Sequence, residues 1–448
     1  MPALAVAGVT AAVATFGVVD TAPATAATLA GAMVVPAGGP AFAADAPDPD
    51  ILRAGRTYYA YTTGTTWGNH IGVLESSQPS SGFHTVTGAS WGSTALGPLP
   101  AWQRVDTQTS PGVFYWAGHY VMFYDAIATS SGLYCISVAT SAQPQGPFVD
   151  RSSGPLICQW LLGGSVDPAP FVDPSGRPWL YWKSNGGASN QPAHLWVAAL
   201  GGDGTTLASP ATDVLDQNTV AHPWQTTIEN PSMVYTLGGY YLFFAGGGWQ
   251  TPGYAEGYAV CAGPAGPCTQ TSAGPLLTSY ASAAGPAAGN AFPDAAGNLW
   301  LSYAAWTAGC TSYACGGQRR LYVAPLTLLP RSLNAPIVGR ADTPDHSGYW
   351  LVASDGGVFT FGDAGFYGSA GAIRLARPIT AMASTPDGRG YWLVASDGGV
   401  FTYGDAGFYG STGGIRLPEP IVGVQPSIDG HGYRLLTADG SAYKFGDA

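Results

Sequence analysis

Three carboxylic acids stand in apolar, proline-marked surroundings and could perform acid–base chemistry. They are Asp48 in APDPDIL, Asp167 in SVDPAPF and Glu229 in IENPSMV, and each precedes a stretch typical of a β-strand. An apolar environment raises the pKa of a carboxyl group and makes it a proton donor, whereas a better solvated carboxylate stays ionised and can act as a base. Glycoside hydrolysis uses such a pair. Taken singly, each motif is also typical of a turn that begins at Asp–Pro.

Other catalytic signatures are absent from the sequence. It contains no G-x-S-x-G, no H-E-x-x-H, no P-loop and no EF-hand loop, and its seven histidines are scattered without the spacing of metal ligands. No C-x-x-C or zinc-finger spacing occurs among the cysteines. We therefore expect structural histidines, no metal site and no cofactor.

Six cysteines predict disulfide bonds. Six cysteines allow 15 connectivities, and proximity in the sequence favours the pairs Cys135–Cys158, Cys261–Cys268 and Cys310–Cys315. Disulfides are typical of exported proteins. The cysteines thus agree with an extracellular location.

The N-terminal region resembles a secretory signal. Residues 4–19 form an apolar run, and an A-x-A sequence follows at residues 24–26, but no Lys or Arg precedes Arg53. The run is shorter than the roughly 20 apolar residues of a transmembrane helix. We expect a signal-like segment at residues 1–27, a linker at residues 28–45 and a secreted protein with no transmembrane segment.

Composition limits the class of partner. Charged residues make up 10% of the chain and the net charge is −11, with no run of Lys or Arg, so nucleic acid is not an expected partner. Aromatic residues make up 12%, which suits a surface that binds neutral ring-shaped ligands such as sugars. The same aromatics are equally typical of the interior of β-sheets.

Strand patterns must position the three acids. Aromatic and β-branched runs such as TYYAYT, HYVMFY and GYYLFF follow turns rich in Gly, Asp or Pro, and they recur about every 55–65 residues. This recurrence predicts an all-β chain whose residues 46–330 form a five-bladed β-propeller. The innermost strands of a propeller line its central channel, so the three acids would meet at one mouth.

The remaining residues, 331–448, repeat with a period of 42. Residues 336–377 and 378–419 are identical at 31 of 42 positions, and a third copy occupies residues 420–448, with residues 331–335 as the expected linker. Such units need stacked neighbours to bury their apolar faces. They predict a small β-repeat domain and resemble Gly-Asp-Ala-rich repeats of secreted actinobacterial proteins. Contact with the cell wall through residues 331–448 and a role as a spacer are both open.

The blocks around the acids resemble a known family. APDPDIL with TYYAYTTGT, SVDPAPFVD, and IENPSMV with GGYYLFFAGGGW are similar to the signature blocks of glycoside hydrolase family 43, over about residues 46–330. The resemblance implies an inverting hydrolase with Asp48 as the general base and Glu229 as the general acid. It implies that Asp167 raises the pKa of Glu229 and orients it.

The sequence departs from the family pattern near the expected channel. Thr109 stands where many members carry Trp, the segment GPAAGN (285–290) lacks the usual His, and Tyr-His-Ala-Trp becomes YAAW (303–306). The missing His removes an expected ligand of a channel calcium ion, and such an ion stays an open alternative to a site without a metal.

Two functions from different classes remain open at this point. The first is a secreted inverting hydrolase of plant pentose polysaccharides or oligosaccharides, with α-L-arabinofuranoside or β-xyloside bonds as substrates. The alternative is a non-catalytic carbohydrate-binding propeller on a cell-surface or wall-associated protein. A purely structural surface protein is disfavoured, because three channel-entry carboxylates would then have no role.

Overall fold

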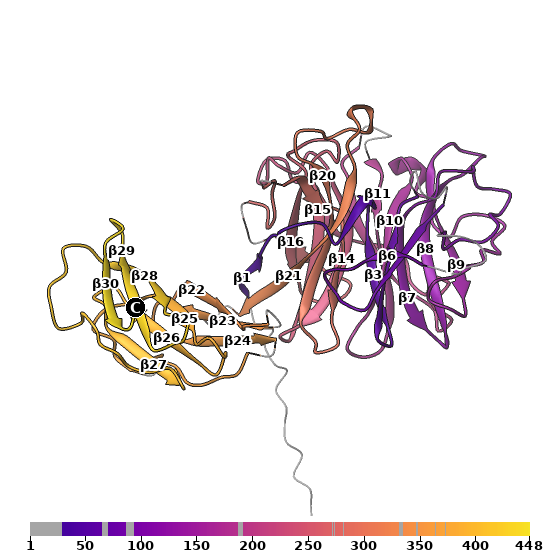
Figure 1. Cartoon of the computed structure of the whole chain (residues 1–448). Coiled ribbons are helices and arrows are strands. Elements are labelled where there is room, and N and C mark those ends of the chain that lie inside the picture. Colours follow the sequence, from indigo (N-terminus) through magenta and orange to yellow (C-terminus); the bar gives the residue numbers. More distant parts are fainter. Residues whose placement is uncertain are drawn as a thin grey trace, which may run out of the picture.

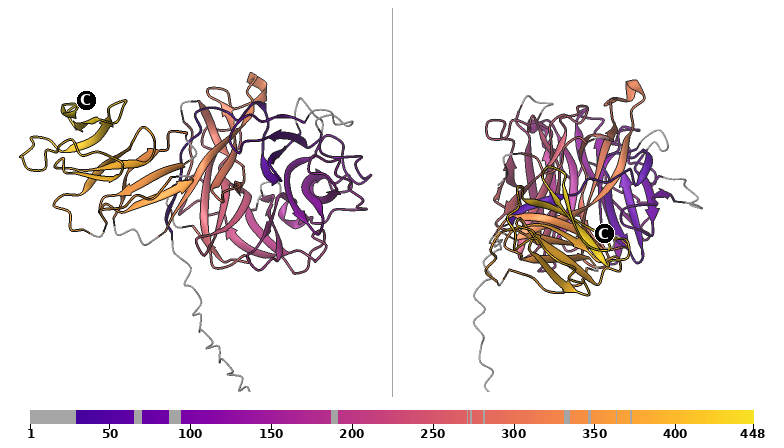
Figure 2. Two further views of the ribbon diagram at one scale, coloured as in Figure 1. Left: turned by 60° about the horizontal axis from the view of Figure 1, so that its bottom comes forward. Right: turned by 60° about the vertical axis from the view of Figure 1, so that its left-hand side comes forward.

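The computed structural model describes residues 29–448 except 65–69, 87–93, 187–190, 271, 273, 281, 331–334, 346–347, 363 and 372. The expected signal segment and most of the expected 331–335 linker lie outside the described residues. Within these residues, five β-sheets form a propeller, and three smaller sheets follow beside it (Figure 1). The strands of the propeller curl around a common centre (Figure 2, left). The prediction of an all-β propeller followed by a β-repeat domain is confirmed.

The first four blades are antiparallel meanders built from consecutive strands. Blade 1 contains β3 (Asp50–Ala54), β4 (Thr57–Thr62), β5 (Gly72–Ser76) and β6 (His84–Thr85). Blade 2 contains β7 (Thr109–Trp116), β8 (His119–Ile127) and β9 (Tyr134–Ser141). Blade 3 contains β10 (Ser165–Val172), β11 (Pro178–Ser184), β12 (His194–Ala199) and β13 (Thr212–Asp216). Blade 4 contains β14 (Ile228–Thr236), β15 (Gly239–Gly246), β16 (Ala255–Cys261) and β17 (Cys268–Thr269).

Blade 5 joins the two ends of the propeller. Its later strands are β18 (Ala283–Ala287), β19 (Ala291–Pro293), β20 (Leu299–Thr307) and β21 (Arg319–Pro330). Both β1 (Leu29–Val34) and β2 (Phe42–Asp45) pair antiparallel with β21. A linker was expected at residues 28–45, and for the described part of this range the expectation is wrong, because β1 and β2 complete the last blade and so close the ring.

Aromatic strands fill the spaces between blades. The sequence GYYLFFAG of β15 illustrates the pattern, since Tyr241 and Phe243 face blade 5 whereas Leu242 and Phe244 face blade 3, and all four are fully buried. Side chains on alternate positions of a strand point to opposite faces of the sheet. One apolar cluster therefore lies between each pair of adjacent blades around the ring.

Three disulfides join neighbouring segments of the propeller. They are the predicted pairs Cys135–Cys158, Cys261–Cys268 and Cys310–Cys315. The last of these spans η3 (Tyr313–Cys315), a short 3₁₀ turn that leads into β21. Within the described part of the chain, no helix is long and apolar enough to cross a membrane.

The 42-residue repeats form three similar three-stranded sheets. The first contains β22 (Ile337–Asp342), β23 (Gly348–Ala353) and β24 (Val358–Gly362). The second contains β25 (Ile379–Ser384), β26 (Gly390–Ala395) and β27 (Val400–Gly404). The third contains β28 (Ile421–Pro426), β29 (Gly432–Thr437) and β30 (Ala442–Gly446). Apolar clusters between successive sheets bury Trp350 and Trp392, so the repeats stack as expected for units that share their cores.

Candidate active site

One backbone conformation recurs where each inner strand begins. Five residues take the left-handed conformation with φ between 48° and 59° and line the central channel, namely Asp48, Ser110, Asp167, Asn230 and Ala288. Left-handed residues other than glycine are uncommon, and strained backbone of this kind clusters at functional sites. The pairing of β7, β10 and β14 shifts register at the same place. Such bulges redirect side chains, and here they bring carboxylates from separate blades to one end of the channel.

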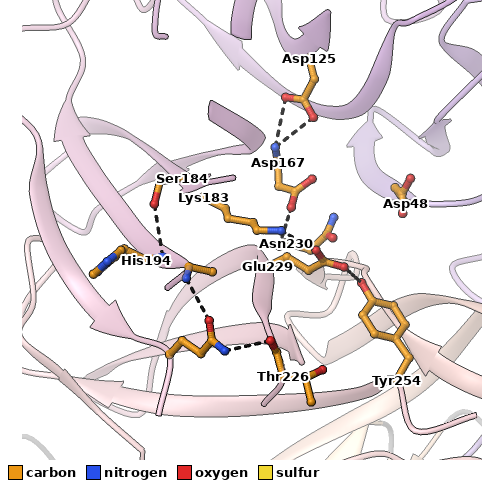
Figure 3. Close-up of polar contacts among 12 residues, drawn as sticks. Asp48, Asp125, Asp167, Lys183, Ser184, His194, Thr226, Glu229, Asn230 and Tyr254 are labelled. Atoms are coloured by element: carbon orange, nitrogen blue, oxygen red, sulfur yellow. Dashed lines mark hydrogen bonds and ion pairs between the residues drawn. The ribbon is translucent and has the colours of Figure 1, made fainter. Parts of the chain in front are cut away.

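All three predicted acids line one cavity. The cavity has a volume of about 480 Å³, and Asp48, Asp167 and Glu229 contribute to its wall from blades 1, 3 and 4. Figure 3 shows the three carboxylates around one opening, with Lys183 next to Glu229. The convergence predicted from the strand pattern is therefore present.

Asp48 is held by two donors and lies on one side of the cavity. Its Oδ2 accepts a hydrogen bond of 2.7 Å from the Thr63 hydroxyl, and its Oδ1 lies 2.7 Å from Nη2 of Arg319. The side chains of Asp48 and Arg319 are only 13% and 8% exposed. This carboxylate is thus fixed in orientation while one edge faces the cavity.

Glu229 is held by a different pair of donors. Nζ of Lys183 lies 2.7 Å from Oε2, and the Tyr254 hydroxyl donates to Oε1 at 2.6 Å. Burial by itself raises the pKa of Glu229, but the charge of Lys183 and the hydrogen bonds from Lys183 and Tyr254 outweigh it, so the net pKa is lowered. The sequence predicted a raised pKa for this residue. The structure differs because Lys183 supplies a buried positive charge in contact with it.

Asp167 carries the raised pKa instead. Burial is the largest cause and the charge of Glu229 the next, and together they raise the pKa of Asp167 to about 6, against the opposing effect of Lys183. Its Oδ2 accepts the backbone N–H of Asn230 at 3.1 Å, the residue that follows Glu229. Asp167 therefore interacts electrostatically with Glu229 and also fixes the backbone beside it.

Several residues of the cavity escaped the sequence analysis. They are Asp45, Asp125, Lys183 and Arg319, together with Tyr254, which donates a hydrogen bond to Glu229 from behind the lining. Asp125 is 1% exposed, and both of its carboxyl oxygens accept the Asp167 backbone N–H at 3.1 Å; burial and the charge of Asp167 raise its pKa well above the usual range. The sequence does single out Lys183 as a candidate site residue, because it is one of two lysines in the chain and directly follows the apolar run PWLYW. Arg319 gave no such signal, since its function depends on the closure of blade 5.

An aromatic wall flanks the Asp48 side of the cavity. The exposed Trp249 ring stacks on the buried Trp306, with 5.9 Å between the ring centroids and 15° between the ring planes. The Arg319 guanidinium lies 5.3 Å from the centroid of the Trp249 ring. Tyr313, on η3, packs edge-on against Trp306 at 4.9 Å. Trp306 belongs to the YAAW segment, so this residue supports the wall from beneath while Trp249 and Tyr313 line the cavity.

A narrow channel adjoins the cavity at the segment that lacks the usual His. Calcium takes six to eight oxygen ligands, and Ala288 and Gly289, which face this channel, have no side-chain oxygen. The Asp50 carboxylate there accepts the Val113 N–H at 2.7 Å, and burial raises its pKa to about 7. The Asn290 side-chain oxygen accepts the Ile51 N–H. Each of these two side chains thus accepts a hydrogen bond from the protein backbone.

Elsewhere on the propeller, His194 contacts two carboxylates. Nδ1 of His194 lies 2.8 Å from Asp213 and 2.5 Å from Asp216, and the ligand atoms of the three residues are within 4.8 Å of one another. A similar exposed group in the third repeat contains Asp429, His431 and Asp447. The 2.8 Å distance to Asp213 is ordinary for an imidazole that hydrogen-bonds to a carboxylate, so this group does not by itself indicate an ion.

Comparison with known proteins adds a family and a fold. A family model described as "Glycosyl hydrolases family 43" matches residues 38–329. No curated protein matches the sequence significantly.

Solved structures share the propeller. A thermostable family-43 glycoside hydrolase is 21% identical with a TM-score of 0.55, over 67% of this chain and 98% of that chain. An endo-1,4-beta-xylanase from Bacteroides thetaiotaomicron is 24% identical with a TM-score of 0.52, over 64% and 95%. An alpha-L-arabinofuranosidase from Lactobacillus brevis is 16% identical with a TM-score of 0.50, over 64% and 94%. At these identities the likeness concerns the fold.

Proposed function

Because the chain belongs to glycosyl hydrolases family 43, and is thus a glycoside hydrolase of a family whose characteristic mechanism is inverting, we propose that it hydrolyses pentose polysaccharides or their oligosaccharides at α-L-arabinofuranoside or β-xyloside bonds. One observation supports this more than any other. Asp48 and Glu229 enter the same cavity from different blades, each with its own cationic partner, Arg319 for one and Lys183 for the other.

The proposed reaction gives the two carboxylates different tasks. Asp48 takes a proton from a water molecule, whose oxygen forms a bond to the anomeric carbon as the glycosidic bond breaks. Glu229 gives a proton to the departing oxygen. Water attacks the face opposite the leaving group, so the configuration at the anomeric carbon is inverted. Before the next cycle, solvent supplies a new proton to the Asp167–Glu229 pair, and the proton on Asp48 leaves to solvent.

Glu229 must carry a proton before it can act as the general acid. Lys183 favours the ionised form of Glu229, whereas the raised pKa of Asp167 favours its protonated form. A bound sugar excludes water and adds an oxygen that accepts a hydrogen bond, and we infer that it moves the proton to Glu229. Asp167 then returns to the ionised form and helps to keep that proton in place, since like charges close together disfavour double ionisation.

The choice of pentose substrates rests on two supports. Two neighbours with a TM-score of at least 0.50 are named as an endo-1,4-beta-xylanase and an alpha-L-arabinofuranosidase. The wall formed by Trp249 and Tyr313 offers apolar ring faces, which suit the C–H faces of a neutral sugar.

Export and independence from a cofactor complete the proposal. Three disulfides support an oxidising compartment such as the exterior of the cell. The carboxylates of the site have protein donors, and the proposed steps need only proton transfers. We therefore propose a secreted enzyme that works without a metal ion.

The test is a panel of aryl arabinofuranosides, aryl xylosides and debranched arabinan with NMR detection of the first product anomer. We expect hydrolysis of at least one pentoside with inversion. The variants Asp48→Asn and Glu229→Gln should each lose about 10²–10⁴-fold in kcat/KM, with Asp355→Asn in the first repeat as the control. Full activity in either variant, or a product with retained configuration, would contradict the proposed roles.

A second candidate function is a propeller that binds sugars without hydrolysing them. The Lys183–Glu229 ion pair favours it, because an acid that stays ionised cannot protonate a leaving group. Binding of an arabinan or xylan oligosaccharide without turnover of any aryl pentoside would support this function over hydrolysis.

A further inference from the structure

A second cavity lies between the propeller and the first repeat, apart from the site described above. It has a volume of about 360 Å³. The propeller lines it with Asn298 and Trp300 of blade 5, and the repeat lines it with Arg340, Asp342 and Phe361. Figure 1 shows β21 of blade 5 beside β22–β24 of the repeat.

The repeat side of this cavity is ordered by an arginine and two rings. The Arg340 guanidinium lies 4.2 Å from the centroid of the Tyr349 ring, and that ring stacks on Phe361 at 4.8 Å and 15°. The Tyr349 hydroxyl hydrogen-bonds to Thr327 of β21, which links the repeat to blade 5. Arg340 also pairs with Asp342 through both Nε, at 2.8 Å, and Nη2, at 2.6 Å.

The other repeats show that this polar pair is not needed by the repeat fold. At the positions of Arg340 and Asp342, the second repeat carries Met382 and Ser384 and the third carries Val424 and Pro426, although the first two repeats are identical at 31 of 42 positions. Met382 is 6% exposed and packs in the core shared by the first two repeats. The second repeat packs Met382 against its neighbour at this position, whereas the first repeat places the charged side chains of Arg340 and Asp342 beside a cavity.

The chemistry of the lining selects one class of ligand. Asp342 neutralises Arg340 through two contacts, so the pair does not attract an anion, but both side chains remain partly exposed, at 42% and 29%, and can exchange hydrogen bonds with hydroxyl groups. Trp300 and Phe361 are half-buried and add apolar ring surface. A purely apolar ligand would leave the charged pair desolvated without new partners.

We propose that this junction cavity binds a neutral sugar residue of a polysaccharide chain. A volume of about 360 Å³ falls within the range of small-ligand pockets. The class of polymer, arabinan or xylan, rests on the proposed function; the sugar chemistry rests on the cavity itself. The enzyme would thus bind its polymer at a second site besides the active-site cavity. The first repeat would have a binding role that the other two repeats do not share.

The experiment measures polymer binding by the full chain. Affinity gel electrophoresis in arabinan and in arabinoxylan uses the Glu229→Gln background, so that the polymer stays intact. The double variant Arg340→Met, Asp342→Ser carries the residues that the second repeat has at the same positions, and we expect at least fivefold weaker retardation. Phe361→Leu, which keeps apolar volume but removes the ring, should weaken binding in the same direction.

The matched control removes an Arg–Asp pair elsewhere in the repeats. Arg389 and Asp387 of the second repeat are exposed and 3.9 Å apart, and Arg389→Met, Asp387→Ser should leave retardation unchanged. In the active background, the Arg340→Met, Asp342→Ser variant should hydrolyse small aryl glycosides at the parental rate.

Three results would overturn the inference. The first is equal retardation of the junction variant and its parent. The second is a loss of retardation in the control variant as large as in the junction variant. The third is that neither polymer retards the parent. Failure of the proposed function is a separate result, because it is seen as no turnover of aryl pentosides and leaves the dependence of binding on Arg340 intact.

Discussion

The ammonium group of Lys183 lies 2.7 Å from Oε2 of Glu229, and both side chains are almost fully buried. A cation at this distance favours the ionised form of the carboxyl group, whereas the proposed reaction uses its protonated form. Asp167 has a raised pKa and can hold a proton close to Glu229, so it opposes the effect of Lys183 on the protonation of Glu229. The balance between Lys183 and Asp167 therefore sets the pH range in which Glu229 can act.

Replacement of the lysine tests that balance. In Lys183→Met the charge and the hydrogen bond of Lys183, the two strongest causes that lower the pKa of Glu229, are removed while burial, which raises it, remains. A general acid loses activity as the pH rises through its pKa, so the alkaline limb of the kcat/KM profile should move to higher pH. Profiles of kcat/KM against pH for an aryl pentoside measure this shift.

The control for that variant is Lys444→Met, which removes the other lysine of the chain from an exposed position in β30. Its profile should match the parent. An alkaline limb that stays in place in Lys183→Met would show that Glu229 does not supply the proton.

The aromatic wall should affect binding more than chemistry. Trp249→Ala removes a ring that stacks on Trp306 and borders the cavity. An aromatic contact is worth about 0.5–1.5 kcal/mol beyond buried area, so KM for an oligosaccharide should rise roughly 2- to 10-fold with kcat changed less. Tyr115→Ala, an exposed ring at the far end of β7 beside its hairpin to β8, should leave both constants unchanged. A fall in kcat with constant KM would contradict a role in binding.

A chelator should leave the enzyme active. The carboxyl oxygens near the channel accept protein hydrogen bonds, as Asp50 does from Val113, and Ala288 provides no ligand atom in its side chain. Dialysis against EDTA should therefore change kcat/KM by less than about twofold. Loss of activity that calcium restores would show that a metal ion acts in the channel after all.

The sequence predicts local features of this fold better than distant ones. The aromatic runs TYYAYT and GYYLFF form β4 and β15, and the cysteines pair with near neighbours, because strand propensity and short loops act locally. The Asp–Pro and Glu–Asn–Pro motifs bring their acids to one cavity because each marks the start of an inner strand.

Features that depend on ring closure were not predictable from local patterns. β1 is rich in Ala and Gly, and its partner β21 lies almost 300 residues away in the sequence. The partner of Asp48, Arg319, lies on that same β21, 271 residues further along the chain. The charge next to Glu229 could be anticipated only in part, because Lys183 stands out in its strand but nothing local shows which acid it contacts.

Contact between two inner strands gives the last prediction. At Gly112 of β7, an added Cβ would lie 2.1 Å from the carbonyl oxygen of Pro168 in β10, the residue after Asp167. Gly112→Ala must therefore push the two strands apart, which costs about 1–3 kcal/mol or more and displaces Asp167 from its hydrogen bond to Asn230. We expect a lower midpoint in urea together with a lower kcat.

The comparison variant is Gly39→Ala, where an added Cβ would meet nothing within 4 Å. It should unfold at the same urea concentration as the parent and keep full activity. If Gly112→Ala matched it in both measurements, the close approach of β7 and β10 would not be what holds Asp167 in place, because the shift that the added Cβ forces at Pro168 would then have no effect on the carboxylate beside it.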